Sequence, residues 1–262
     1  KLMLRSGTDF WADTRVNIVS FERVRNGNQT PGRYSEEVLG SQETNHDFLL
    51  TYDKMFTSDF SFLAQVGGAQ RLNSYKRNYT YVGELIVDGL YNLSNSNPSQ
   101  NIAESRIEKS EVQSLYGSAQ FGYLNALFLD VTARNDWSST LPSEDRSYFY
   151  PSLSASAVFT DLMDIKSSVL TFGKVRASWA QVGNDADPYQ LAQTFRSGGS
   201  WNGSTAQYYE NNTIANSGLK PEITTGIELG LDLRFLRNKV GLDITYYDQT
   251  TENQILGVEI SK

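Results

Sequence analysis

Residues 223–235 read ITTGIELGLDLRF, a run in which two kinds of side chain alternate. The odd positions hold isoleucine, leucine, phenylalanine and one threonine, and the even positions hold threonine, glycine, glutamate, aspartate and arginine. A period of two cannot gather apolar side chains on one face of a helix, but on a strand it makes one apolar and one charged face. The run therefore predicts a β-strand, and its 13 residues can cross a bilayer at a tilt of about 45°.

A second strand follows directly. Residues 236–239 read LRNK, and residues 240–247 (VGLDITYY) then resume the alternation, which indicates a long antiparallel hairpin. Noisier copies of the pattern predict three more hairpins, formed by residues 47–52 with 60–68, 115–123 with 127–134, and 153–159 with 169–181. Before residue 47 the pattern is irregular, and we expect strands near residues 1–10 and 15–25.

The predicted connections alternate between short and long. The short ones are residues 53–58, 122–125, 161–168 and 236–239, and the long ones are residues 71–111, 135–150 and 183–221. The long connections are rich in Asn, Ser, Gly and Tyr, which favour turns and loops. Short periplasmic turns and long extracellular loops are typical of outer-membrane barrels. We therefore predict an all-β fold, in which residues 1–262 are part of one large antiparallel transmembrane β-barrel.

A soluble β-sandwich also alternates, with one face in its core and the other in water. Its strands usually run only about 5–6 residues, however, and the run from residue 223 is much longer. The lengths of the strands therefore favour the membrane.

Composition excludes several function classes. No stretch approaches the roughly 18 consecutive apolar residues of a membrane-spanning helix, whereas a barrel can have a polar average such as the mean hydropathy of -0.44. The net charge of -7 argues against a nucleic-acid partner. With no cysteine and one histidine, His46, the chain offers neither a thiolate metal site nor a Ser-His-Asp triad. We expect no enzyme activity and no cofactor.

Two groups of residues are candidates for function. Charged residues on the even face would line the lumen of a barrel, either as a hydrated wall network or in contact with a substrate. Aromatic residues in the long connections could stack on sugar rings, anchor a partner protein or pack loop against loop. The lumen candidates are Lys174, Arg176, Glu228, Asp232, Arg234 and Asp243, and the loop candidates are Trp201, Tyr208, Tyr209, Tyr189 and Tyr91.

Three segments, in order, resemble the SusC/RagA family of TonB-dependent transporters. They are SLYGSAQFGY from residue 114 with its continuation to residue 159, VRASWAQVGNDADPYQL from residue 175, and NSGLKPEITTGIELGLDLRF from residue 216. The family's motif positions fall on Tyr116, Gly117, Arg134, Asp136, Ser138, Ser139, Pro151, Ser152 and Ser154. The chain departs from the family at Tyr150, where Phe is usual, at Pro221, where Trp is common, and in lacking a Gly-Trp pair after the serines.

The resemblance, which covers roughly residues 45–256, implies an importer in the bacterial outer membrane. Such a barrel has about 22 strands, a plug, a SusD-like lipoprotein lid and a drive through TonB, and it takes up oligosaccharides or oligopeptides. This chain would supply about eight or more of the strands, and we expect the plug and the last strands to lie outside it. The alternatives are a soluble secreted glycan-binding β-sandwich and a passive or structural outer-membrane barrel.

Overall fold

The structure is a computed structural model that describes residues 1–23, 29–210 and 213–258. Nine strands form one sheet in the order β1-β4-β5-β6-β7-β8-β9-β12-β13, so the predicted all-β fold is confirmed. The strands of this sheet are β1 (Leu2–Val19), β4 (Arg33–Met55), β5 (Phe60–Val82), β6 (Asn101–Tyr123), β7 (Leu127–Ser138), β8 (Ser147–Val158), β9 (Leu170–Asn184), β12 (Glu222–Phe235) and β13 (Val240–Glu252). The short elements are β2 (Glu22–Arg23), β3 (Gln29–Thr30), β10 (Phe195–Trp201), β11 (Thr205–Glu210), α1 (Phe159–Leu162) and a 3-10 turn (Pro98–Gln100).

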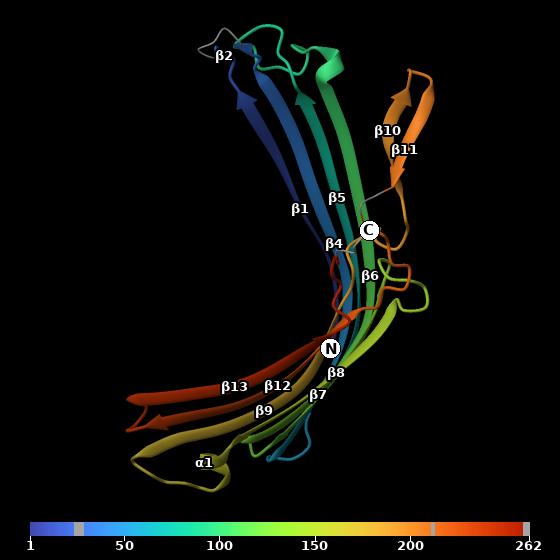
Figure 1. Ribbon diagram of the computed structural model, residues 1–262. Coiled ribbons are helices and arrows are strands. Elements are labelled where there is room, and N and C mark those ends of the chain that lie inside the picture. Colours follow the sequence, from blue (N-terminus) through green and yellow to red (C-terminus); the bar gives the residue numbers. More distant parts are fainter. Residues whose placement is uncertain (24–28, 211–212, 259–262) are drawn as a thin grey trace. The chain divides into compact units, whose positions relative to one another are not determined.

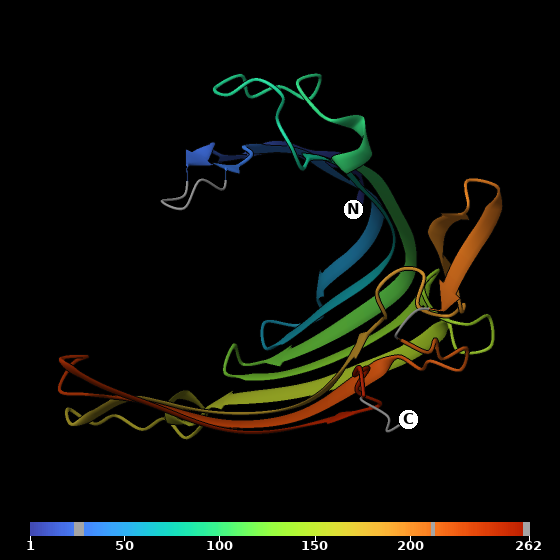
Figure 2. The same cartoon turned by 45° about the horizontal axis from the view of Figure 1, so that its top comes forward.

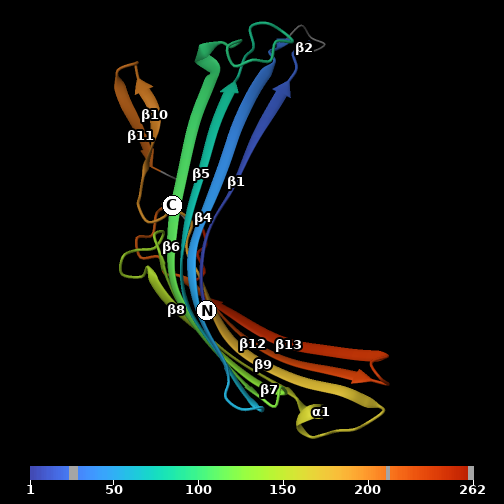
Figure 3. The same cartoon turned by 180° about the vertical axis from the view of Figure 1, so that it is seen from behind.

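By contacts the chain divides into two units. Unit 1 comprises residues 1–5, 46–70 and 111–262, and unit 2 comprises residues 6–45 and 71–110. Within unit 1, strands β9, β12 and β13 run side by side, as both Figure 1 and Figure 3 show. Within unit 2, the remaining parts of β1, β4, β5 and β6 do the same (Figure 1).

No helix among the described residues is both long enough and apolar enough to cross a membrane.

The hairpin predicted at residues 223–247 is present. Strands β12 and β13 pair from Ile223 with Glu252 to Phe235 with Val240, without a register shift. The connecting turn places Leu236, Arg237 and Asn238 at φ values of 53°, 57° and 65°. The left-handed region suits asparagine but is unfavourable for leucine and arginine. The turn is therefore held by the two long strands that it joins.

The N-terminal strands differ from the prediction. Instead of two strands near residues 1–10 and 15–25, one strand, β1, runs from Leu2 to Val19, and β4 begins at Arg33, before the predicted start at residue 47. Most residues of β1 are exposed on both faces. The alternation nevertheless runs through all of β1, with Leu2, Leu4, Phe10, Val16 and Ile18 at even positions and its charged residues at odd positions. Small polar residues and Trp11 interrupt it in the middle, which is where the prediction divided the strand.

The long connection predicted at residues 71–111 is wrong in extent. Strand β5 continues to Val82 and β6 begins at Asn101, so that only residues 83–100 connect them. The extra strand segments belong to unit 2 and are polar on both faces. Cross-strand pairs join them, among them Arg77 Nη1 with Glu104 Oε2 at 3.5 Å and Ser105 Oγ with Asn78 Oδ1 at 3.0 Å. A strand with two polar faces has the composition of a loop.

The other long connections are also partly ordered. The one predicted at 135–150 shrinks to residues 139–146, because β7 and β8 extend into it. The connection at 183–221 contains the hairpin β10–β11, seen as a separate orange ribbon in Figure 2. Its three-residue turn, Asn202 to Ser204, has Asn202 at φ 52° and Gly203 at φ 74°, and both residue types tolerate the left-handed region. An Asn-Gly pair is a turn signal that the sequence alone contains.

The register separates the two faces of the sheet in unit 1. Residues paired directly across strands lie on the same face. One such row is polar throughout and the next row along the strands is apolar. The polar row is Asp130, Ser154, Ser178 and Glu228, and the apolar row is Leu129, Ala155, Ala177 and Leu229. The alternation predicted from residues 223–235 therefore holds across β7, β8, β9 and β12.

Large side chains on the apolar face are exposed: Leu129 is 39% exposed and Leu229 50%. The polar face is partly exposed as well, with Asp130 and Ser178 half-buried and Glu228 exposed. Aromatic rings gather on the apolar face near the short turns, with Phe62 against Phe121 at 5.0 Å between ring centroids. A soluble protein places its apolar side chains the other way round.

Aromatic residues also mark the loop end of this apolar face. Trp137 lies ten residues along β7 from Leu127, which pairs with Tyr123 in the turn-end aromatic group. At about 3.4 Å per residue and a tilt of about 45°, the two aromatic levels lie roughly 24 Å apart. An apolar band about 25 Å tall between two aromatic girdles is characteristic of membrane barrels. We call the apolar face between these levels the apolar belt.

Two adjacent glycines in β5 let rings from neighbouring strands lie on the sheet. A Cβ added at Gly68 would lie 2.6 Å from Phe48 Cε1, and one added at Gly67 would lie 2.6 Å from Tyr116 Cε2. Phe48 covers the apolar face and Tyr116 the polar face. The Tyr116-Gly117 motif of the sequence thus contributes its ring to a position where β5 has no side chain.

Candidate functional site

The structure brings the six predicted charged residues together on the polar face. Lys174 pairs directly with Asp232, and Asp232 pairs with Asp243. The other three share the face by their register: Arg176 on β9, and Glu228 and Arg234 on β12. The three strands β9, β12 and β13 therefore present one continuous charged surface.

One cation bridges two strands of this surface. Arg176 on β9 reaches across β12 to β13, where its Nη2 lies 3.0 Å from Asp243 Oδ1 and 2.6 Å from Thr245 Oγ1. This reach is possible because the residue between them is Gly230, which pairs with Arg176 and has no side chain. Arg234 Nη2 lies 3.6 Å from Asp232 Oδ2. Ion pairs exposed to this degree stabilise a protein by only about 0–1 kcal/mol, so these charges stay hydrated.

A denser polar network lies on the same face and is built from the motif residues. The carboxylate of Asp136, whose side chain is 7% exposed, accepts bonds from Arg134 Nε at 2.7 Å and from the Tyr150 hydroxyl at 2.6 Å. Arg134 also donates to Ser114 Oγ at 2.9 Å and lies over the ring of Tyr116. The network ties β6, β7 and β8 together, and the tyrosine at position 150 supplies a hydroxyl that phenylalanine would lack.

The serines after this motif hold the loop connection. Ser138 Oγ donates to Asp185, which begins the next long connection, and also bonds Thr140 Oγ1 at 2.9 Å. Ser139 Oγ accepts from the backbone N–H of Glu111 at 2.9 Å. Asp185 was absent from the predicted site residues, and it joins two connections that are far apart in the sequence. Within the residues that the structure describes, no group of His, Cys, Asp or Glu side chains is placed to hold a metal ion.

The tie between Ser138 and Asp185 predicts local protection of the loop. Ser138→Ala in the full-length protein is expected to speed trypsin cleavage after Arg146 about fivefold, because one hydrogen bond to a carboxylate, worth about 1 kcal/mol, is lost. Ser143→Ala, an exposed change in the same loop, is the matched control. Equal cleavage rates of the two variants would mean that the tie does not order the loop.

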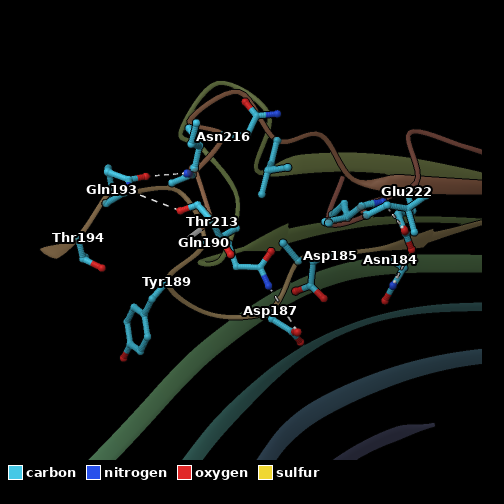
Figure 4. Close-up of a pocket in the computed structure, with 18 residues that line it drawn as sticks. Asn184, Asp185, Asp187, Tyr189, Gln190, Gln193, Thr194, Thr213, Asn216 and Glu222 are labelled. Atoms are coloured by element: carbon cyan, nitrogen blue, oxygen red, sulfur yellow. Dashed lines mark hydrogen bonds between the residues drawn. The ribbon is translucent and has the colours of Figure 1, made fainter. Parts of the chain in front are cut away.

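A hollow of about 550 Å³ lies where β9 ends and β12 begins. Figure 4 shows side chains from both parts of the long connection around it, among them Asp187, Gln190, Gln193 and Asn216. Gln193 supports the wall, since its Oε1 accepts from the Ala215 N–H at 2.8 Å. Amide and carboxylate side chains line the hollow together with apolar ones such as Leu219 and Ile255, so it offers hydrogen bonds to hydroxyl or amide groups of a ligand beside apolar surface.

Glu222 closes the strand side of this hollow. Its Oε1 accepts from the Ile255 N–H at 2.8 Å and its Oε2 from Asn184 Nδ2 at 3.0 Å. These two bonds fix the orientation of the Glu222 carboxylate at the edge of the hollow.

The five predicted loop aromatics separate into different places. Tyr189 lines the hollow and is 65% exposed. Trp201, Tyr208 and Tyr209 lie on the hairpin β10–β11 with more than half of each residue exposed. Tyr91 lies in unit 2, where it packs against the cluster of Tyr34, Val82 and Leu85. The structure therefore gives these residues three separate surroundings.

The family is decided by a match along nearly the whole chain. Residues 4–261 match the family model described as "TonB dependent receptor-like, beta-barrel". The chain belongs to this family. Members are outer-membrane β-barrel proteins, so the predicted location in the bacterial outer membrane is confirmed. The alternative of a soluble β-sandwich is excluded.

Two curated relatives come from Formosa agariphila. TonB-dependent receptor P26 is 30% identical over 183 residues, covering 66% of this chain and 18% of that protein. TonB-dependent receptor P3 is 28% identical over 155 residues, covering 57% of this chain and 15% of that protein. The chain therefore spans less than a fifth of the length of either relative, in agreement with the expectation that it is part of a barrel.

Solved structures share the fold. The RagAB peptide transporter superposes with a TM-score of 0.86 at 17% identity, over 99% of this chain and 29% of that one. The RagAB peptide importer in the "closed-closed" state gives a TM-score of 0.82 at 18% identity, over 95% of this chain and 28% of that one. The resemblance to the SusC/RagA type, first seen in the motifs, is thus matched in the fold.

Proposed function

We propose that the chain forms part of the wall of an importer that carries a polar oligomer, an oligosaccharide or an oligopeptide, across the outer membrane. The observation that supports this is the combination of an exposed apolar belt with a continuous charged face behind it. In a membrane barrel such a belt contacts lipid and the opposite face lines the lumen. The hydrated charges around Arg176 and Asp243 then border the transport path.

The partners follow from the same proposal. TonB supplies the drive through a segment outside this chain, as the family's description suggests, and a SusD-like lipoprotein covers the loop side. The similarity of fold to RagAB supports the second partner. In this arrangement the exposed aromatic residues of β10–β11, with Trp201 63% exposed, are available to the lid or to the substrate.

Energy coupling can be tested in cells that depend on the full-length receptor for growth on one oligomer. Uptake of the labelled oligomer is expected to stop when the proton-motive force is dissipated, and Arg176→Ala is expected to slow uptake several-fold with normal amounts of folded barrel. Arg237→Ala, at the turn after β12, is the control and should leave uptake unchanged. Uptake that continues without the proton-motive force would instead identify a passive barrel.

Sidedness is a second test. Single cysteines placed at Ser143 and Trp201 are expected to react with an impermeant thiol reagent on intact cells, because both positions lie in connections on the loop side. Cysteines at Asn125 and Asn238, in the short turns, are expected to react only after the outer membrane is opened. The measurement uses full-length protein without other cysteines. Labelling at Asn238 but not at Trp201 on intact cells would show that the short turns, and not the long connections, face the outside of the cell.

A further inference from the structure

The hollow between the end of β9 and the start of β12 lies on the polar face of the sheet. Asn184 and Glu222, which close its strand side, pair directly across the two strands. Each lies an even number of residues from a charged residue of its own strand, Arg176 on β9 and Glu228 on β12, so that all four share one face. A substrate that enters from the loop side would therefore meet this hollow before it reaches the charges around Arg176.

The lining of the hollow carries negative charge that no lining cation balances. Its 18 residues comprise three carboxylates, four side-chain amides, three hydroxyls, seven apolar side chains and one glycine. The carboxylates are those of Asp185, Asp187 and Glu222, and none of the 18 residues is a lysine, an arginine or a histidine. Lys220 lies in the same connection but is not part of the lining. The hollow therefore combines an anionic rim with a large apolar share.

A buried cluster fixes the apolar side of the hollow. Ala186 lines the hollow and packs with Leu141 and Tyr148, and each of the three is at most 7% exposed. Leu219 and Ile255 pack against this cluster and line the hollow as well. This side is therefore preformed, and little conformational entropy is lost there when a ligand binds.

Two of the three carboxylates are engaged by the protein itself. Asp185 accepts a hydrogen bond from Ser138 Oγ, and Glu222 accepts bonds with both of its oxygens. The third, Asp187, accepts from Gln190 Nε2 at 3.5 Å, which is longer than the usual range, and a dashed line joins the two side chains in Figure 4. Asp187 and Gln190 therefore keep an acceptor and a donor for a ligand, and one hydroxyl group can use both.

We infer that the hollow is a subsite for one uncharged sugar residue of an oligosaccharide substrate. A pyranose ring presents C–H groups on its faces and hydroxyl groups around its edge, and the lining divides in the same way. One face of the ring lies on Leu219 and Ile255, and the edge hydroxyls exchange hydrogen bonds with Asp187 and Gln190. The volume of the hollow, about 550 Å³, falls within the range of roughly 300–1,000 Å³ that small-molecule sites have. The inference deepens the proposed import function and rests on it.

The charge of the lining decides between an uncharged sugar and other cargo chemistries. A uronic acid, a sulfated sugar or the terminal carboxylate of a peptide brings an anion, which the three carboxylates repel and no lining cation pairs. A protonated amine is attracted by the same charge, but it must lose water beside seven apolar side chains, and a single carboxylate, Asp187, is left to bind it. An uncharged, hydroxyl-rich ring avoids both penalties.

The experiment probes an array with the labelled full-length receptor in detergent. The array carries uncharged, uronic and sulfated oligosaccharides of matched length, with lysine-containing oligopeptides beside them. We expect retention on at least one uncharged oligosaccharide and no stronger retention on any anionic sugar or peptide. Ala192→Trp, which fills the hollow from an exposed lining position, is expected to abolish this retention. Ala206→Trp, at an exposed alanine of β11 outside the lining, is the matched control and should bind like the parent.

A second pair of variants tests the charge of the lining. Asp187→Asn keeps an acceptor oxygen but removes one negative charge, so it is expected to raise the retention of uronic oligosaccharides several-fold and to change that of uncharged ones little. Asp164→Asn removes an exposed carboxylate in the short connection after α1 and should change neither. All four variants should keep the heat-modifiable mobility of a folded barrel.

The outcomes separate this inference from the proposed function. Equal retention by Ala192→Trp and Ala206→Trp would overturn the inference, as would stronger retention of anionic sugars or peptides by the parent, or no retained sugar at all. Uptake of a peptide that depends on the proton-motive force would, beside such a result, leave the import function standing. Sugar bound in the hollow without energy-coupled uptake would instead keep the subsite and remove the import function.

Discussion

Leu229→Arg in the full-length receptor is expected to destabilise the barrel by about 2–4 kcal/mol, whereas Asp232→Arg is expected to leave its stability nearly unchanged. Leu229 lies at the middle of the alternating run in β12, 50% exposed, between Ala177 and Tyr246 on the apolar face. An arginine there enters hydrocarbon. Asp232 lies between Lys174 and Asp243 on the hydrated face, where a new cation remains in water.

The measurement is denaturant unfolding of the receptor in lipid, with heat-modifiable mobility as a second readout. Leu229→Phe is the matched control, because it keeps the position apolar and is expected to fold like the parent. The two arginine variants differ only by three positions along one strand. If Asp232→Arg unfolded the barrel and Leu229→Arg did not, β12 would face the other way, and the lumen assignment of the charged face would be wrong.

Asp136→Ala is expected to cost about 2–4 kcal/mol, because it removes two charge-assisted hydrogen bonds and leaves a half-buried cation without its counter-ion. The carboxylate is nearly buried and holds both Arg134 and Tyr150. Tyr150→Phe removes only one of these bonds and is expected to cost about 1 kcal/mol. Unfolding of the full-length receptor in lipid measures both effects.

Asp130→Ala is the control for Asp136. Asp130 lies on the same strand and the same face, and its carboxylate accepts a hydrogen bond from a neutral partner, Gln120 Nε2, at 2.6 Å. Its loss is expected to cost no more than about 1 kcal/mol. Equal destabilisation by the two alanine variants would show that the network around Asp136 gains nothing from its second bond.

The strands of the apolar belt were predictable because their two surroundings impose alternation. The run at residues 223–235 identified β12, its partner β13 and the face of each charged residue. Residues 71–82 and 101–110 of unit 2 were assigned to a loop, because both of their faces carry polar side chains and no period of two results. Sequence pattern detects a strand through a difference between its faces, and where that difference vanishes only pairing with a neighbour reveals it.

The sequence also predicted only part of the candidate site: the charged face, but not the bond between Ser138 and Asp185 or the hollow. Counting alternate positions along each strand predicted that the six charged residues share one face of the sheet, and the pairing of β9, β12 and β13 places them so. The tie between Ser138 and Asp185 joins two connections separated by 47 positions, which no local pattern reports. Gln193 and Asn216 are ordinary loop residues by composition, and only the fold of the connection turns them toward one hollow.

The glycine pair in β5 has a consequence for how relatives vary. At Gly67 and Gly68 the surface of the sheet is formed by the rings of Tyr116 and Phe48. Each glycine and the ring beside it are therefore expected to change together during evolution. A larger residue at position 68 is expected in relatives whose residue at position 48 is small. Phe48 is 42% exposed, so its exposure alone would let position 48 vary without a matching change at position 68. Compensated pairs of this kind should mark the strand register in an alignment even where overall identity falls below the level that identifies the family.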